Sequence, residues 1–90
     1  MRTLQKFIDD NNRWIAIFGK PARNFPLDQS DVDDILRTLD SNLSPENLHC
    51  DGEITPAEAN RKYRFYAQVA RELEAYCAKN QLNYVEPMEL

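Results

Sequence analysis

A single long amphipathic segment near the carboxyl end of the sequence limits the folds that this chain can adopt. Its start carries three helix signals, since Thr55 is a capping hydroxyl, Pro56 suits the first helical position and Glu58 completes a capping box. Small and apolar residues then recur at spacings of 4-3-4-3-4: Ala59, Tyr63, Tyr66, Ala70, Leu73 and Cys77. The pattern predicts a helix over residues 56–80 with a heptad-like seam, roughly 37 Å long at 1.5 Å per residue.

A shorter helix is predicted at the amino end. We expect it to start with Thr3 as its cap and to end at Gly19, which Pro21 follows closely. Ile17 adds an apolar side chain on a second face, so this helix either is buried on more than one side or presents surface to a partner. Its periodic positions fall three and four residues apart: Leu4, Phe7, Ile8, Asn11, Trp14, Ile15 and Phe18.

The middle of the chain predicts a second short helix. Ser30 is the expected N-cap, with Asp33 as the acid of a capping box. Ser44 to Leu48 then reads as one extra helical turn with Pro45 at its first position. The apolar stripe of the second helix is Val32, Ile35, Leu36, Leu39 and Leu43.

These elements predict an all-α protein: a compact three-helix domain with a short extra helical turn before a long C-terminal helix. The 90 residues make one domain at most. We assign residues 1–81 to the single helical domain and residues 82–90 to a C-terminal tail. A chain of this size has little room for a deep substrate pocket.

The net charge of -4 is unevenly distributed. Residues 28–53 hold eight acids and one base, a charge of -7, whereas residues 54–80 hold five bases and three acids, a charge of +2. Phosphate contacts need a basic surface, so direct nucleic-acid binding is not expected. The acidic segment is either a solvated face with helix caps or a surface for a basic protein partner, with Asp31, Asp34 and Asp40 as contact residues. Bases on one face of the long helix are expected to be solvent-exposed and paired with neighbouring acids: Arg61, Arg64 and Arg71.

The last third of the long helix is a second candidate interface. A helix of this length should outrun its two neighbours, which would leave Leu73, Tyr76 and Cys77 without intramolecular cover. The partner would then be a second copy, giving a homodimer, or another protein. The alternative is that residues 82–85 fold back and cover this part of the seam.

The side-chain chemistry gives no sign of an enzyme or a cofactor. His49, Cys50, Asp51 and Glu53 form the one cluster of catalytic residue types, but adjacent Cys and His side chains rarely converge, and no second histidine can serve as a base. A zinc site needs four ligands with paired spacing, which one histidine and two separated cysteines do not supply. We therefore expect a non-enzymatic protein without a resident metal.

Calcium is the sharper alternative, because residues 47–58 align with a twelve-residue EF-hand loop. In that register Asn47, Asp51, Glu53 and Glu58 are the candidate ligands. However, Asn47 stands where EF-hands carry aspartate, and the third position is His49. The capping box of the long helix explains the second half of the pattern without metal.

The expected setting is the cytoplasm of a bacterium or of an infected cell. No run of about 20 apolar residues predicts a membrane span, and the amino end lacks the apolar core of a signal peptide. Cys50 and Cys77 are accordingly expected as free thiols.

The stretch Leu43-Ser44-Pro45-Glu46-Asn47-Leu48-His49-Cys50-Asp51-Gly52-Glu53, followed by a charged helix, resembles a motif of small uncharacterised phage and bacterial proteins. The resemblance extends from Leu43 to about Lys79 and transfers no functional residue. It implies a phage or mobile element as the source, and by analogy an inhibitor of host defence or of a host enzyme. The sequence thus predicts a protein-binding module, with a calcium-binding module and a self-associating subunit as alternatives.

Overall fold

The computed structural model describes residues 2–44 and 55–88. Three helices make up the described part: α1 (Arg2–Ala16), α2 (Gln29–Leu43) and α4 (Pro56–Asn80). The predicted all-α three-helix architecture is confirmed for these residues, which contain no strand. The predicted extra turn over Ser44 to Leu48 lies almost wholly outside the described residues.

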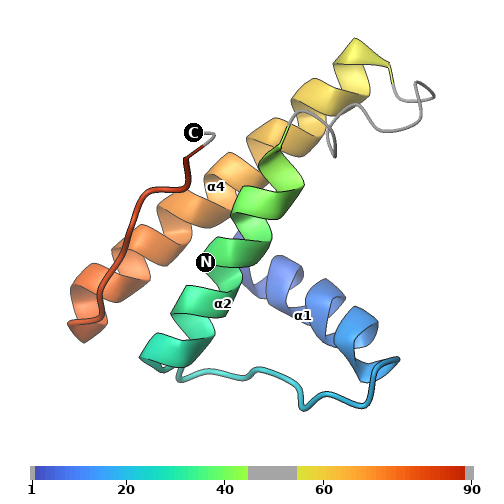
Figure 1. Ribbon diagram of the computed structural model, residues 1–90. Helices are drawn as coiled ribbons and strands as arrows, with labels where there is room; N and C mark the ends of the chain where they lie inside the picture. The colour runs from blue at the N-terminus through green and yellow to red at the C-terminus, as the bar shows by residue number, and fades with distance from the viewer. Residues whose placement is uncertain (1, 45–54, 89–90) are drawn as a thin grey trace.

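The long helix α4 is the central element, because it packs against both α1 and α2. Figure 1 shows α2 and α4 side by side and running in opposite directions, with α1 crossing at an angle. Among the described residues, no helix is both long and apolar enough to cross a membrane. One core joins the three helices and Leu27, which lies two residues before α2: Leu4, Phe7, Ile8, Leu27, Val32, Ile35, Leu36, Leu39, Leu43, Val69, Ala70, Leu73, Tyr76 and Cys77.

Helix α4 begins and ends where the sequence pattern predicts. The Thr55 hydroxyl accepts a hydrogen bond from the backbone N–H of Glu58, 3.2 Å away, and Pro56 is the first helical residue. The helix ends at Asn80, and Gln81 adopts the left-handed conformation with φ 59°. The backbone N–H groups of Gln81 and Leu82 both bond to the carbonyl of Cys77, which reverses the chain.

The predicted cap of α2 is wrong by two residues. The N-cap is Asp28, whose carboxylate accepts from the Asp31 N–H at 2.8 Å, while the Asp31 carboxylate accepts from the Asp28 N–H at 3.1 Å. This register places Leu27 just before the cap and Val32 at the fourth helical position, and both are buried, as in a hydrophobic staple. A cap at Ser30 would put polar residues at both of those positions.

The start of α1 also differs from the prediction. The helix already includes Thr3, so Thr3 is not its cap. The acceptor is instead the carboxylate of Glu72 on α4, which receives the backbone N–H of Leu4 at 2.9 Å. This bond ties the first turn of α1 to the middle of α4.

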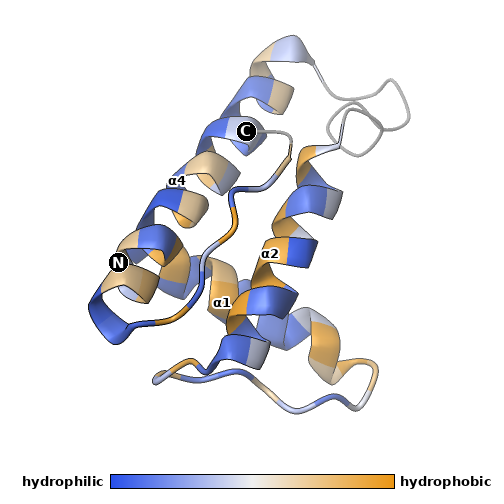
Figure 2. Cartoon of the chain, turned by 60° about the vertical axis from the view of Figure 1, so that its left-hand side comes forward, coloured by the Kyte–Doolittle hydropathy of each residue, from blue (hydrophilic) through white to orange (hydrophobic). Residues whose placement is uncertain are grey.

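The chain after α4 folds back along this helix (Figure 1) and passes between α4 and α2 in the view of Figure 2. The side-chain amide of Gln29 donates to the carbonyl of Asn83 at 3.0 Å and accepts from its N–H at 2.8 Å. Further along, the N–H of Met88 donates to Asp40 at 2.7 Å, and Arg71 pairs with Glu86. Residues 82–88 are therefore a docked segment rather than a projecting tail.

The expectation that the end of the α4 seam lacks intramolecular cover is wrong, because this part of α4 belongs to the common core and Tyr76 contacts Phe25 and Leu27. Leu73, Tyr76 and Cys77 are 0%, 8% and 1% exposed. Leu82 and Tyr84 also pack against this core, as expected if residues 82–85 fold back, whereas Val85 is 71% exposed. These three seam residues are core, and in this conformation they are not available to a partner.

Candidate functional site

Among the described residues, three large apolar side chains are exposed where α1 ends, one in the last turn of the helix and two in the turn that follows it. Trp14, Ile17 and Phe18 are 61%, 72% and 64% exposed. The rings of Trp14 and Phe18 meet edge to face with their centroids 5.8 Å apart. We call these three residues the α1 tip.

The tip is the uncovered continuation of a core-facing stripe. Leu4, Phe7 and Ile8 in the first half of α1 are buried, and the same three- and four-residue spacing continues to Trp14 and Phe18. Figure 1 shows α1 crossing α4 near its first turns and then running away from it. Figure 2 shows hydrophobic colouring at the far end of α1, beyond the other helices. The stripe therefore outruns the helix that covers it.

The segment after the tip is fastened back onto α1 and α2. The side-chain amide of Asn12 donates to the Arg23 carbonyl and accepts from the Arg23 N–H, both at 2.8 Å. The Arg23 guanidinium, only 18% exposed, bonds to Asn11 at 2.7 Å and to Asp34 at 3.2 Å. Gly19, with φ 71°, makes the turn that this return requires. Hydrogen bonds to α1 and to α2 therefore fix the segment that follows the tip.

A groove between α1 and α4 lies beside the tip. It has a volume of about 290 Å³. On α1, Lys6, Asp10 and Trp14 follow one another at four-residue intervals and so share one face, which leads from the groove to the tip. The Lys6 ammonium contacts the Asp10 carboxylate at 2.8 Å. The lining of this α1–α4 groove is Lys6, Asp10, Arg61, Lys62, Phe65 and Tyr66.

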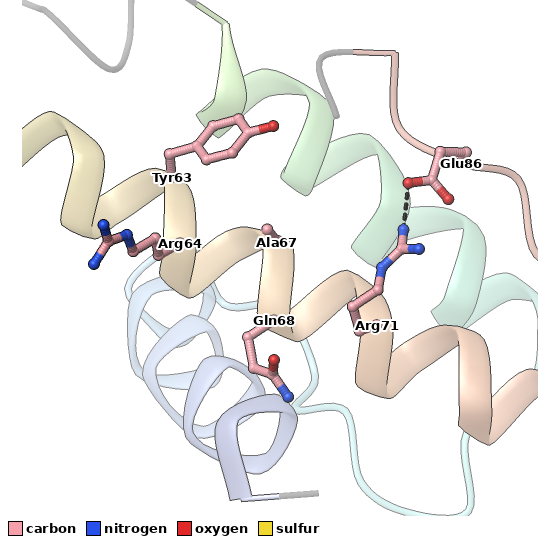
Figure 3. A pocket seen from close by; sticks show the side chains of 6 residues that line it. All are labelled: Tyr63, Arg64, Ala67, Gln68, Arg71 and Glu86. Atoms are coloured by element: carbon pink, nitrogen blue, oxygen red, sulfur yellow. Dashed lines mark hydrogen bonds and ion pairs between the residues drawn. The ribbon is translucent and has the colours of Figure 1, made fainter.

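A larger pocket of about 440 Å³ lies between α4 and the docked segment (Figure 3). Its one carboxylate, Glu86, is bound to Arg71, which also contacts Glu74 at 3.2 Å and the Tyr84 hydroxyl at 3.2 Å. Figure 3 shows Arg64 extending away from this pair. Burial, reinforced by the charge of Glu86, raises the pKa of Tyr84 to about 12, so its hydroxyl stays protonated at neutral pH. Because Arg71 lies on α4 and Glu86 on the docked segment, their ion pair links the segment to the helix. The lining is Tyr63, Arg64, Ala67, Gln68, Arg71 and Glu86.

The three acids predicted as contact residues all have intramolecular partners. Asp31 belongs to the α2 capping box. Asp34 pairs with Arg23 at 3.2 Å and with Arg37 at 3.4 Å. Asp40 accepts the N–H of Met88. A steering role for these acids stays a prediction, but each of them contributes to the fold as well.

The remaining candidate residues divide between the core and the part of the chain that is not described. Cys77 is a buried free thiol, and burial raises its pKa, which favours the unreactive protonated form. Of the candidate calcium ligands, Asn47, Asp51 and Glu53 lie outside the described residues, as do His49 and Cys50. Glu58 lies in the first turn of α4. Within residues 2–44 and 55–88, no group of three or more His, Cys, Asp or Glu side chains could hold a metal ion.

The α1 tip itself was only partly visible in the sequence. Ile17 on a second face was the signal, whereas Trp14 and Phe18 follow the same periodicity as core residues. Compared with protein families, curated proteins and solved structures, the chain matches none of them. Its function must therefore be inferred from this surface.

Proposed function

We propose that this chain is a non-enzymatic protein-binding module and that the α1 tip is its contact surface. The observation that carries the proposal is the exposure of Trp14, the only tryptophan of the chain, together with Ile17 and Phe18. Tryptophan is enriched among the residues that dominate interface energies. Soluble monomers rarely expose contiguous apolar patches larger than a few hundred Å², and such patches mark interaction sites.

The geometry of the tip also suits binding. Burying apolar surface gains about 25 cal/mol per Å², and a partner gains more of it when the surface is already ordered. The edge-to-face contact of Trp14 with Phe18 and the bonds of Asn12 to Arg23 fix the tip before any partner arrives. Little conformational entropy is then lost on association.

The biological setting extends the same proposal. The resemblance of residues 43–53 to phage and bacterial proteins favours a modulator encoded by a phage or mobile element. Such a protein would act in the cytoplasm by stoichiometric binding to a host protein, as an inhibitor of host defence or of a host enzyme.

Site-specific photo-crosslinking tests the proposal. A photoreactive phenylalanine analogue at Phe18 should crosslink one major protein in lysate of the source cell, and the same analogue at Val85 should not. Val85 is a matched control, because it is also apolar and exposed but lies on the docked segment. The purified partner should then bind Trp14→Ser at least tenfold more weakly than wild type and bind Val85→Ser unchanged. Equal binding of both variants would refute the proposal.

Self-association through the same tip is the second candidate, favoured by the self-complementary apolar character of the cluster. It is distinguished by sedimentation equilibrium. A mass that rises with concentration in wild type and stays monomeric in Trp14→Ser would assign the tip to a second copy. A concentration-independent monomer would leave a different protein as the partner.

A further inference from the structure

The α1 tip alone is too small for a stable protein complex. Aromatic side chains offer about 150–250 Å² each, so three partly exposed side chains supply roughly 400 Å². A standard interface buries about 800 Å² on each partner. A partner that binds the tip must therefore extend over neighbouring surface.

The α1–α4 groove is the neighbouring surface that continues from the tip along α1. Its floor is aromatic: Phe65 and Tyr66 meet with ring centroids 5.5 Å apart, and Tyr66 lies edge-on to Phe7 at 6.2 Å. From Lys6 to its last residue, Ala16, helix α1 covers about 15 Å at 1.5 Å per residue, and Ile17 and Phe18 follow in the turn. That length matches a partner helix of about ten residues, and grooves between helices accept amphipathic helices through apolar anchors at i, i+3, i+4 and i+7.

The rim of the groove is basic, in contrast to the acidic chain as a whole. Lys6 on α1 and Arg61 and Lys62 on α4 line the groove together with one acid, Asp10, which gives three cations against one carboxylate. Asp10 is already bound to Lys6 at 2.8 Å and lies 3.9 Å from Arg13. Neither Arg61 nor Lys62 has an ion pair or hydrogen bond with another described side chain. This rim is complementary to carboxylates.

We propose that the α1–α4 groove and the α1 tip together bind an acidic amphipathic helix of another protein. The inference rests on the proposed function and adds the chemistry of the partner. Apolar side chains of the partner helix fill the aromatic floor and cover Trp14, while its carboxylates face Arg61 and Lys62. A single-stranded nucleic acid, which also combines stacking with negative charge, is less well matched, because the net charge of the chain is -4 and Ile17 offers no stacking face.

A display selection tests this chemistry without a known partner. A random library of sixteen-residue peptides is selected on the full-length chain and counter-selected on Trp14→Ser/Phe18→Ser. The enriched peptides should carry Asp or Glu beside apolar residues at helical spacing. By fluorescence polarisation they should bind Arg61→Glu/Lys62→Glu at least tenfold more weakly than wild type, with a gap that narrows as salt rises.

The matched control is Arg37→Glu/Lys79→Glu, which makes the same change in total charge away from the groove and should alter binding less than twofold. Enriched peptides that depend on Trp14 but are neutral or basic, or that respond equally to both charge reversals, would overturn the inference and leave the proposed function standing. No peptide preferring wild type over the tip variant would overturn both. Tighter binding of a twenty-nucleotide oligo-dT than of the best peptide would also overturn the inference, in favour of nucleic acid.

Discussion

At the scale of single residues, the carboxylate of Glu72 joins two helices. Glu72 lies on α4, and its carboxylate accepts a hydrogen bond from the backbone N–H of Leu4 at the start of α1. The carboxylate also accepts a hydrogen bond from the side-chain amide of Gln68 at 2.9 Å. Burial alone would raise the pKa of this carboxyl, but hydrogen bonds from Leu4, Gln68 and Thr3 and the charge of the amino terminus lower it below its ordinary value. The ionised form is therefore the one that stabilises the fold.

We expect Glu72→Gln to lower the free energy of unfolding by about 1 kcal/mol at neutral pH, because a neutral amide oxygen replaces the charged acceptor of the Leu4 N–H. A carboxyl whose pKa is depressed in the folded state contributes stability above its unfolded pKa of about 4.3, and the contribution disappears as the pH falls through the folded value. Urea denaturation near neutral pH and in strong acid measures this. Glu74→Gln, on an exposed carboxylate of the same helix, is the control. A Glu72→Gln deficit that persists in acid would contradict the capping role.

Tyr76 is a second residue that stabilises the fold, through its hydroxyl. It accepts the backbone N–H of Leu27 at 2.8 Å in a buried setting, and its ring packs against Phe25. We expect Tyr76→Phe to cost about 1–3 kcal/mol in unfolding free energy, because the N–H loses its partner. Tyr63→Phe, on a half-buried tyrosine of the same helix, should cost less than about 0.5 kcal/mol. Equal losses of unfolding free energy in the two variants would show that the hydrogen bond of Tyr76 does not stabilise the fold.

At the scale of helices, the sequence predicted what local signals determine. Thr55, Pro56 and the apolar seam predicted the bounds of α4 correctly, because these residues lie within the helix or directly before it. The α2 cap was ambiguous, since Asp28 and Ser30 both stand three residues before an aspartate, and the choice depends on burying Leu27 and Val32. The cap of α1 was out of reach, because its acceptor lies 68 residues from Leu4 in the sequence.

The two α2 registers make opposite predictions for a pair of alanine variants. Asp28→Ala should lower the unfolding free energy by about 1 kcal/mol, because it removes the carboxylate that receives the Asp31 N–H. Ser30→Ala, an exposed change inside the first turn, should stay within about 0.5 kcal/mol of wild type. Thermal or urea denaturation of both variants measures the difference. The reverse order would restore the cap at Ser30.

At the scale of the whole molecule, the sequence analysis predicted that one helix extends past its neighbours, but it named α4 as that helix. The segment after α4 docks on both α2 and α4 through contacts that join distant parts of the chain, such as Gln29 with Asn83 and Arg71 with Glu86. No local sequence pattern predicts such contacts. The uncovered end belongs to α1, whose last turns lie beyond the reach of α4. In the described part of the acidic segment, Asp34 is partly neutralised by Arg23 and Arg37.

The fluorescence of Trp14 tests most directly whether the tip is free to bind, because no other tryptophan contributes to the signal. We expect the native emission maximum to lie close to that of the urea-unfolded chain, iodide to quench both states almost equally, and neither property to change on dilution. Addition of a selected acidic peptide should shift the emission to shorter wavelength and protect it from iodide. A native emission already shifted and protected at every concentration would mean that the chain covers Trp14 itself, and the α1 tip would not be a binding surface.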